Sequence, residues 1–286
     1  MTERLVAGVD FSGAKAVPND TWMTIARVGS LGVEVTELKH VGSHALAKEL
    51  NEHKLAAVGI DCPFSLPQPF IEFLAMKKPS PGFQSWQDVA QELVFMPFEE
   101  FEKLVKEYKK EPKRYCDTVT PVQAISPLHR GNPSMIQMTF AGMRMLAMLD
   151  PAKFFVVPFQ DSIPFGCAVL EVYPRAILKS VDLPDTGYKS ADKSEAEKVA
   201  GVRKRILDGL INLREKKGIT FAKFPRLTVP PKMRQKFLDS DHALDSLVAC
   251  YCTAAYVYDN TLFADPLDAN NMDVLLEGWI FTPQHA

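Results

Sequence analysis

Acidic side chains stand at the ends of apolar segments in four parts of this chain. Asp10 and Asp61 each end a strand-like run, in the related patterns Gly-Val-Asp and Gly-Ile-Asp, and Glu171 lies near the end of a third run. Asp241 and Asp245 are one turn apart in a helical segment, so they share a face. Converging carboxylates repel one another unless cations lie between them, and oxygen ligands suit Mg²⁺ or Mn²⁺. Divalent ions held in this way hydrolyse phosphodiester bonds, so we expect Asp10, Asp61, Glu171 and Asp245 to be catalytic and all five acids to be metal ligands.

Some of these acids also have a purely structural explanation. Asp10 could simply begin the small-residue turn that follows it, because Asp often hydrogen-bonds the nearby backbone. Asp241 is favoured by the dipole of a helix that Ser240 caps. Asp245 lies on the face of that helix that should pack on a sheet, where a carboxylate is costly without a partner or a cation.

Polar residues elsewhere are candidates for substrate contacts. Arg114, His129 and Arg130 lie in connectors of a helical region and could form a cap over an anionic substrate, or could simply belong to solvated loops. Arg175 follows the strand that carries Glu171, and we expect it to contact phosphate as well. In the turn after Asp10, small residues allow a close approach, so the candidate substrate contacts there are Ser12 and Lys15.

The hydrophobic pattern predicts an α/β chain that forms one domain over residues 1–286. A glycine-bearing link joins two β-branched runs as a hairpin, and a helix then leads to a strand parallel to the first. If the strands that end in Asp10 and Asp61 are parallel neighbours, both acids emerge at the carboxyl edge, where open α/β sheets bind ligands. A helical insertion or cap is expected over 77–152. The expected strands are 4–10, 21–28, 33–38, 55–61, 153–157 and 167–173, and the main helices are 43–51, 85–95, 98–110, 135–149, 175–178, 194–217 and 240–256.

Composition limits the classes of protein that fit. The formal net charge is −2, so the chain lacks the overall positive charge of a protein that wraps nucleic acid, and any such contact would use a local patch. The five cysteines are scattered without a CxxC pair, which is typical of reduced thiols. No apolar run reaches membrane-spanning length, and the first strand begins too early to leave room for a signal peptide. We therefore expect a cytoplasmic protein that does not contact a membrane; the oligomeric state cannot be predicted.

Four segments resemble a known family: GVDFSGAK, GIDCPFSLP, LEVYPRA and DHALDSLVACYCTAAY. Their order and spacing resemble the uncharacterised domain-of-unknown-function family number four-twenty-nine, described as predicted nucleases of the RNase H-like superfamily. The resemblance implies an RNase H-like fold, with a mixed five-stranded sheet whose first three strands are antiparallel, flanked by helices and interrupted by a helical insertion after the fourth strand. It also implies Asp10, Asp61 and Asp245 as metal ligands, Glu171 as an additional acid and Asp241 as a secondary candidate.

Three functions remain open at this stage. The first is a metal-dependent nuclease or phosphodiesterase that uses Mg²⁺ or Mn²⁺ and acts on nucleic acid or a small phosphodiester or nucleotide. The second is a nucleotide-dependent phosphotransferase of the actin and sugar-kinase superfold, whose first strand also ends in Asp before a glycine-containing turn; the GxxxxGK[ST] phosphate loop is absent. The third is an RNase H-like module that binds a partner without catalysis.

Overall fold

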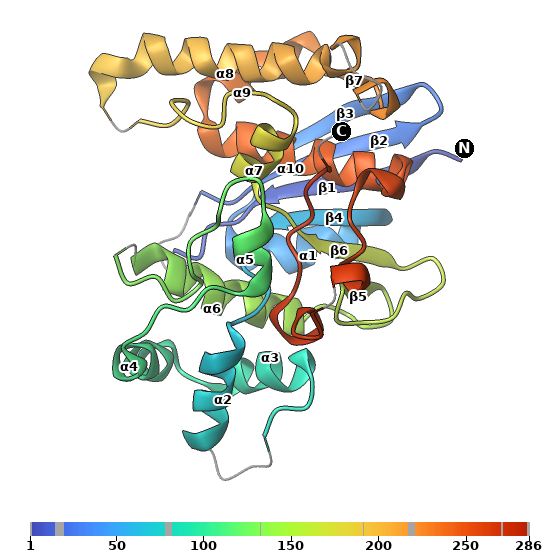
Figure 1. The fold of residues 1–286 in the computed structure, drawn as a ribbon. Helices are drawn as coiled ribbons and strands as arrows, with labels where there is room; N and C mark the ends of the chain where they lie inside the picture. Colours follow the sequence, from blue (N-terminus) through green and yellow to red (C-terminus); the bar gives the residue numbers. More distant parts are fainter. Residues whose placement is uncertain are drawn as a thin grey trace.

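A seven-stranded mixed sheet forms the centre of the molecule in the computed structural model, with helices on both faces (Figure 1). The structure describes residues 2–14, 20–77, 82–131, 133–190, 192–216, 221–269 and 271–284. The strand order is β5-β6-β4-β1-β2-β3-β7. The strands are β1 (Arg4–Asp10), β2 (Trp22–Gly29), β3 (Gly32–His40), β4 (Leu55–Asp61), β5 (Phe154–Val157), β6 (Cys167–Glu171) and β7 (Leu227–Thr228).

The expected α/β class is therefore correct, but the expectation of five strands is wrong. The outermost strands, β5 and β7, extend the sheet at its two edges. A strand near β5 was expected from the sequence, outside the five that the family resemblance implies. β7 has only two residues, which is too short to carry a recognisable alternating pattern.

Strand pairing brings Asp10 and Asp61 to the same edge of the sheet. β1 runs antiparallel to β2, and β2 antiparallel to β3, as the hairpin signal predicts. β1 and β4 are parallel, and their register places Asp10 beside Asp61. β6 continues the parallel arrangement on the other side of β4, with Glu171 paired with Ile60.

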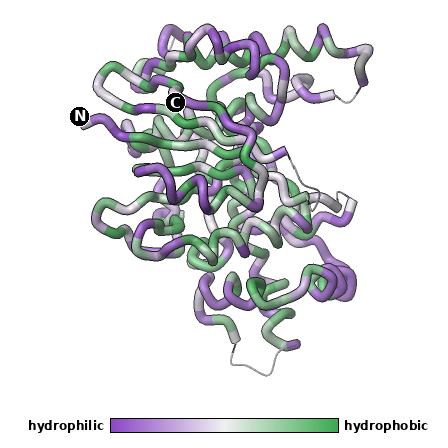
Figure 2. The backbone as a smooth tube through the Cα atoms, turned by 180° about the vertical axis from the view of Figure 1, so that it is seen from behind, coloured by the Kyte–Doolittle hydropathy of each residue, from purple (hydrophilic) through white to green (hydrophobic). Residues whose placement is uncertain are grey.

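The helices divide between the two faces of the sheet. One half of the core packs the sheet against α7, α8, α9 and α10, and the other packs it against α1, α2, α3, α4 and α6. Figure 2 shows hydrophobic segments running through the central strands, while the outer helices alternate between hydrophobic and hydrophilic turns. The helices are α1 (Leu46–Glu52), α2 (Gln68–Lys77), α3 (Trp86–Phe95), α4 (Phe98–Tyr108), α5 (Tyr115–Val119), α6 (Pro133–Ala147), α7 (Pro174–Ser180), α8 (Ala196–Ile211), α9 (Pro231–Asp239), α10 (Asp241–Tyr258) and α11 (Val274–Glu277). The short 3₁₀ helices are Ser43–Ala45, Lys193–Glu195, Leu213–Glu215, Phe221–Lys223, Asn260–Leu262 and Pro266–Ala269.

The helix α10 packs directly against the backbone of the two central strands. A Cβ atom at Gly8 would lie 1.9 Å from Cys250 N, and one at Gly59 would lie 2.2 Å from Thr253 Oγ1. Since side chains alternate across a strand, Asp10 and Asp61 face the same side as these glycines, two residues further on. The small residues thus let α10 approach the strands, and the acids that follow them point toward its first turns.

Helices α2 to α6 lie between β4 and β5 along the chain and extend away from the sheet. The expected helical insertion over 77–152 falls in this region, although its first helix, α2, already begins at Gln68. The C-terminal segment returns to the sheet, where Phe281 N–H donates to Glu171 O at 2.8 Å. No helix in the described ranges is both long enough and apolar enough to cross a bilayer.

Candidate metal centre

Three carboxylates from three separate elements meet at the carboxyl edge of the sheet. Asp10 ends β1, Asp61 ends β4 and Asp245 lies in the second turn of α10. One oxygen atom from each carboxylate lies within 4.8 Å of the other two. The convergence predicted from the sequence is therefore confirmed for these three acids.

Burial makes the concentration of negative charge costly. Asp245 is fully buried, Asp10 is 8% exposed and Asp61 is partly exposed. Burial, together with the charges of Asp10 and Asp245, raises the pKa of Asp61 well above its usual value. Burial also raises the pKa of Asp245, to about 6, although the nearby Lys189 acts in the opposite direction. A divalent cation would relieve this repulsion.

Three further residues contact the carboxylates. His242 Nδ1 lies 2.8 Å from Asp10 Oδ2, and this hydrogen bond raises the pKa of the imidazole. Tyr188 donates its hydroxyl to Asp245 Oδ1 at 3.0 Å, while Lys189 forms an ion pair with Asp245 Oδ2.

Among the described residues, the partner of the buried Asp245 Oδ2 is the Lys189 ammonium. With both basic neighbours protonated, three carboxylates still face only two positive charges. The excess negative charge and the all-oxygen donor set fit a hard cation such as Mg²⁺ or Mn²⁺.

A cavity of about 300 Å³ opens beside Asp61 and Asp245. Arg175 lies in its wall, and its Nε donates to Asp185 Oδ2 at 3.1 Å. The lining residues are Asp61, Tyr173, Pro174, Arg175, Asp185, Thr186, Gly187, Tyr188, Lys189 and Asp245. The cavity therefore gives a small anionic group access to the carboxylates, with two basic side chains in its wall.

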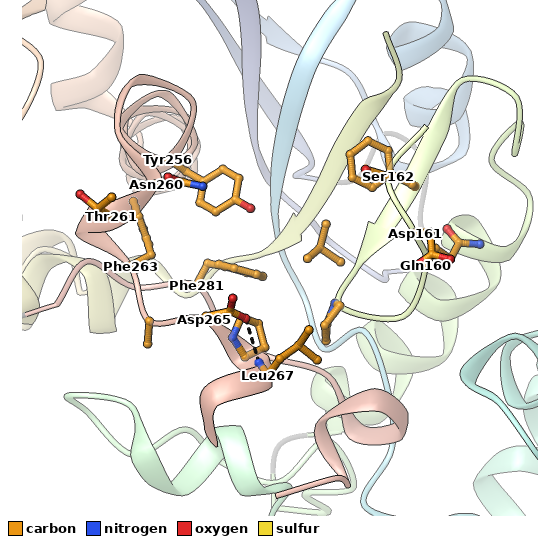
Figure 3. Close-up of a pocket in the computed structure, with 15 residues that line it drawn as sticks. Gln160, Asp161, Ser162, Tyr256, Asn260, Thr261, Phe263, Asp265, Leu267 and Phe281 are labelled. Carbon is orange, nitrogen blue, oxygen red and sulfur yellow. Dashed lines mark hydrogen bonds between the residues drawn. The ribbon is translucent and has the colours of Figure 1, made fainter. Parts of the chain in front are cut away.

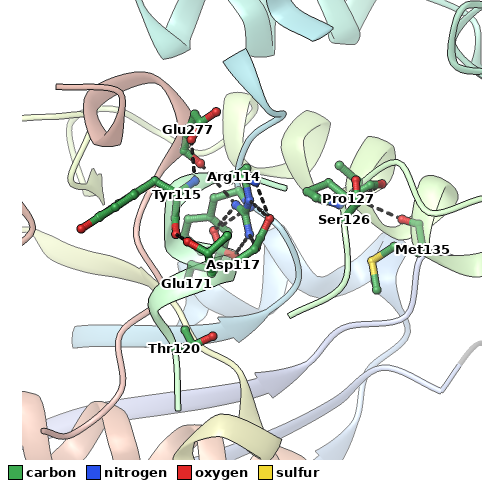
Figure 4. A network of polar contacts seen from close by, with 12 residues as sticks. Arg114, Tyr115, Asp117, Thr120, Ser126, Pro127, Met135, Glu171 and Glu277 are labelled. Atoms are coloured by element: carbon green, nitrogen blue, oxygen red, sulfur yellow. Dashed lines mark hydrogen bonds and ion pairs between the residues drawn. The ribbon is translucent and has the colours of Figure 1, made fainter. Parts of the chain in front are cut away.

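Arg114 lies in the interior, and its expected role as a substrate contact is wrong (Figure 4). Its side chain is only 1% exposed, and its guanidinium donates to both oxygens of Glu171 at 2.6 and 2.8 Å. The guanidinium also donates to both oxygens of Asp117, at 2.8 and 3.2 Å. Because the guanidinium nitrogens are bonded to two buried carboxylates, Arg114 has a structural role and does not contact a ligand.

Glu171 belongs to this ion-pair network and lies outside the group formed by the three aspartates. Besides Arg114, it accepts the backbone N–H of Phe64 at 2.9 Å. Glu277 extends the network, accepting the N–H groups of Gln68 and Tyr115 at 2.7 Å each. These contacts fix the starts of α2 and α5 against the C-terminal segment. Figure 4 shows the contact of Tyr115 with Glu277.

Asp241 also lies outside the group of three aspartates. Its Oδ1 pairs with Arg203 Nη2 at 3.1 Å.

His129 and Arg130 both contact Glu111. His129 Nδ1 lies 2.7 Å from Glu111 Oε2, and Arg130 Nε lies 2.8 Å from Glu111 Oε1. The hydrogen bond from Arg130 has the larger effect, and together with that of His129 it lowers the pKa of Glu111 to about 2. The structure therefore brings neither basic residue to the three aspartates.

Ser12 has a local structural role in the turn after β1. Its backbone N–H donates to Thr21 Oγ1 at 3.0 Å, and its hydroxyl accepts the N–H of Ala14 at 3.4 Å. The predicted contact at Lys15 lies outside the described residues. The turn is thus tied to the residue that precedes β2.

A larger cavity, of about 460 Å³, lies at the other end of α10 (Figure 3). Its wall includes Tyr256 and Asn260, and helix geometry puts Tyr256 about 16 Å along the axis from Asp245. Asp161 and Asp265 also line it, and no basic side chain does so in the part of the chain that is described. The cavity shares no residue with the three aspartates and is unsuited to an anionic substrate.

The sequence did not single out Tyr188, Lys189 or His242. His242 had a signal, since it lies within the same helical segment as Asp241 and Asp245. Tyr188 and Lys189 lie in an irregular segment between α7 and α8, where no periodicity indicates which residues face the sheet. No family model matches the chain, and no curated protein or solved structure shows significant similarity to it.

Proposed function

We propose that this protein is a metal-dependent phosphodiesterase, with nucleic acid or a nucleotide as its substrate. The observation that supports this most strongly is the meeting of Asp10, Asp61 and Asp245 within 4.8 Å. Three acids on β1, β4 and a late helix also fit an RNase H-like nuclease, as does the antiparallel arrangement of β1, β2 and β3. The fold assignment is thus part of the proposal.

In this proposal, Asp10, Asp61 and Asp245 hold Mg²⁺ or Mn²⁺. A bound ion would supply positive charge for the phosphoryl transition state and would favour ionisation of the attacking water. Arg175 in the cavity wall binds a phosphate oxygen, and its planar guanidinium suits that geometry. His242 orients the Asp10 carboxylate through the hydrogen bond to Oδ2.

Lys189 serves as the counter-charge of Asp245 in the protein without bound metal. Its side chain is 49% exposed, so the ammonium can reach solvent, but the buried carboxylate of Asp245 then loses its ion-pair partner. A cation that neutralised Asp245 would leave Lys189 able to contact a phosphate in the adjoining cavity.

The phosphotransferase alternative has less support. A second phosphate loop would have to follow β4, but Phe64 already donates its N–H to Glu171. The hydroxyl of Ser65 also has a partner, because it donates to Leu276 O at 2.6 Å. The donors that would hold a phosphate there are thus committed to the protein itself.

Calorimetric titration with Mn²⁺ tests the metal site. We expect Asp10→Asn and Asp245→Asn to weaken Mn²⁺ binding by more than about tenfold, which corresponds to ~1.4 kcal/mol. Asp241→Asn is the matched control on the same helix, because Asp241 pairs with Arg203, and it should bind as the wild type does. Cleavage of a fluorescent single-stranded oligonucleotide should follow the same order. Equal Mn²⁺ affinity in wild type and Asp10→Asn would refute the proposal.

A further inference from the structure

A second accessible cavity begins directly beside the proposed active site, on the other face of the sheet. Its volume is about 520 Å³. Phe11 and Gly13, from the turn that follows Asp10, form part of its wall. The remaining lining residues come from the 3₁₀ helix Ser43–Ala45, from α1, α4 and α6, and from the residue that follows α6: Ser43, His44, Ala47, Phe98, Gln137, Phe140, Ala141, Arg144, Met145 and Met148.

Aromatic rings form the apolar side of this cavity. Phe98 and Phe140 meet edge to face, with ring centroids 5.4 Å apart. Met148, whose side chain is 67% exposed, lies at the rim, and methionine adapts readily to flat ligands. Aromatic surfaces of this kind bind nucleobases by stacking, which is independent of base identity.

The polar side of the cavity carries positive charge that the protein leaves uncompensated. The Arg144 guanidinium lies 5.1 Å from the centroid of the Phe140 ring. Among the described residues, Arg144 has no acidic partner and no hydrogen bond, and the described lining contains no acidic side chain. His44, which is exposed, adds a second basic group. An unpaired guanidinium with five donors beside an aromatic wall matches a phosphate attached to a planar ring.

The position of the cavity connects it to the carboxylates. Gly13 is three residues after Asp10, so their Cα atoms are at most about 11 Å apart. The turn between them packs tightly on α6, since a Cβ atom at Gly13 would lie 2.4 Å from the Met138 Cα. One wall of the cavity is therefore held at a fixed place relative to the proposed metal ligands.

We propose that this cavity binds a nucleotide, with the base against Phe98 and Phe140 and the phosphate at Arg144. This inference rests on the proposed function and adds a substrate class to it. The cavity holds a nucleotide next to the phosphodiester bond that is cleaved. The Gln137 amide, which can both donate and accept, faces the same cavity and can bind a base edge.

Titration with AMP in the absence of metal tests the cavity independently of catalysis. We expect Arg144→Gln to weaken AMP binding at least tenfold, and Ala141→Phe, which fills the cavity, to do the same. Arg130→Gln is the matched control, because it removes an arginine that is already paired with Glu111, and it should bind AMP as the wild type does. Ribose 5-phosphate, which lacks the base, should bind at least tenfold more weakly than AMP.

The variants also separate this inference from the proposed function. Asp10→Asn should lose Mn²⁺ binding but keep AMP binding, whereas Arg144→Gln should keep Mn²⁺ binding and raise the KM for a short oligonucleotide with little change in kcat. If Asp10→Asn keeps Mn²⁺ binding while AMP binding still depends on Arg144, the proposed function fails and the nucleotide site stands. Absence of AMP binding to the wild type, or equal binding to wild type and Arg144→Gln, would overturn the nucleotide site.

Discussion

Replacing Gly8 with alanine tests whether close packing of α10 on β1 positions the aspartates. The added methyl carbon would lie 1.9 Å from Cys250 N, 2.4 Å from Cys250 Cα and 2.5 Å from Ser246 O. All three are backbone atoms of α10, so no change of rotamer can relieve the collision. Either the helix moves away from the strand or the strand bends.

The size of the effect follows from these distances. Carbon contacts are favourable at roughly 3.5–4.0 Å, so the helix has to retreat by about 1.5 Å near Cys250. Inserting a methyl group into a packed core costs about 1–3 kcal/mol. Gly8→Ala should cost about 3 kcal/mol, at the upper end, because the methyl group on the β1 backbone meets backbone atoms of α10. For a chain of this size, that corresponds to a decrease in Tm of roughly 6–12 °C.

Urea unfolding and Mn²⁺ titration measure the two consequences together. We expect Gly8→Ala to lose stability and to bind Mn²⁺ more weakly, because a displaced α10 carries Asp245 away from Asp10. Gly201→Ala is the control: Gly201 is an exposed residue of α8, and a Cβ atom there meets nothing within 4 Å. That variant should gain about 0.5–1 kcal/mol, because alanine is the better helix former. Gly8→Ala with wild-type stability and Mn²⁺ affinity would refute the reasoning.

Three further predictions follow from the contacts of individual residues. Glu171→Gln removes a charged partner of the buried Arg114, and urea unfolding should show a loss of about 3–5 kcal/mol; a loss below 1 kcal/mol would contradict the network. Protons compete with the cation for Asp61 and Asp245, whose pKa values are both raised, that of Asp245 to about 6, so calorimetric Mn²⁺ affinity should fall by about tenfold or more per pH unit below pH 6. If the Mn²⁺ affinity is the same at every pH from 5 to 7, that competition is excluded. His129→Ala and Arg130→Ala should leave Mn²⁺ binding and oligonucleotide cleavage unchanged, since both side chains serve Glu111; loss of cleavage in either variant would place them at the substrate.

The sequence predicted the position of two of the three aspartates because they follow a repeated local pattern. Asp10 and Asp61 each end an apolar run in a Gly-x-Asp pattern, and parallel pairing then brings them to one edge. Asp245 was predictable from helical spacing, which places it on the apolar face of α10. Each inference required only a local period and one topological rule.

Long-range partners left no such signal. Glu171 and Arg114 are 57 residues apart, and nothing in either segment indicates that the arginine is buried as the partner of the glutamate. Asp61 and Glu171 both lie at strand ends, but their surroundings differ. Asp61 lies beside the other two aspartates, whereas Glu171 forms an ion pair with Arg114. The two-residue strand β7 and the contacts of Lys189 with Asp245 were missed for the same reason, because they depend on tertiary packing rather than on local periodicity.

Crystals soaked in Mn²⁺ and recorded at the manganese absorption edge test the central claim most directly. We predict an anomalous peak within about 2–2.5 Å of carboxylate oxygens from Asp10, Asp61 and Asp245, with Lys189 withdrawn from Asp245. The same experiment on Asp245→Asn should show a weak peak or none. A peak at other residues, or an ion-free site in crystals soaked at saturating Mn²⁺, would contradict the assignment of these three aspartates as a metal site.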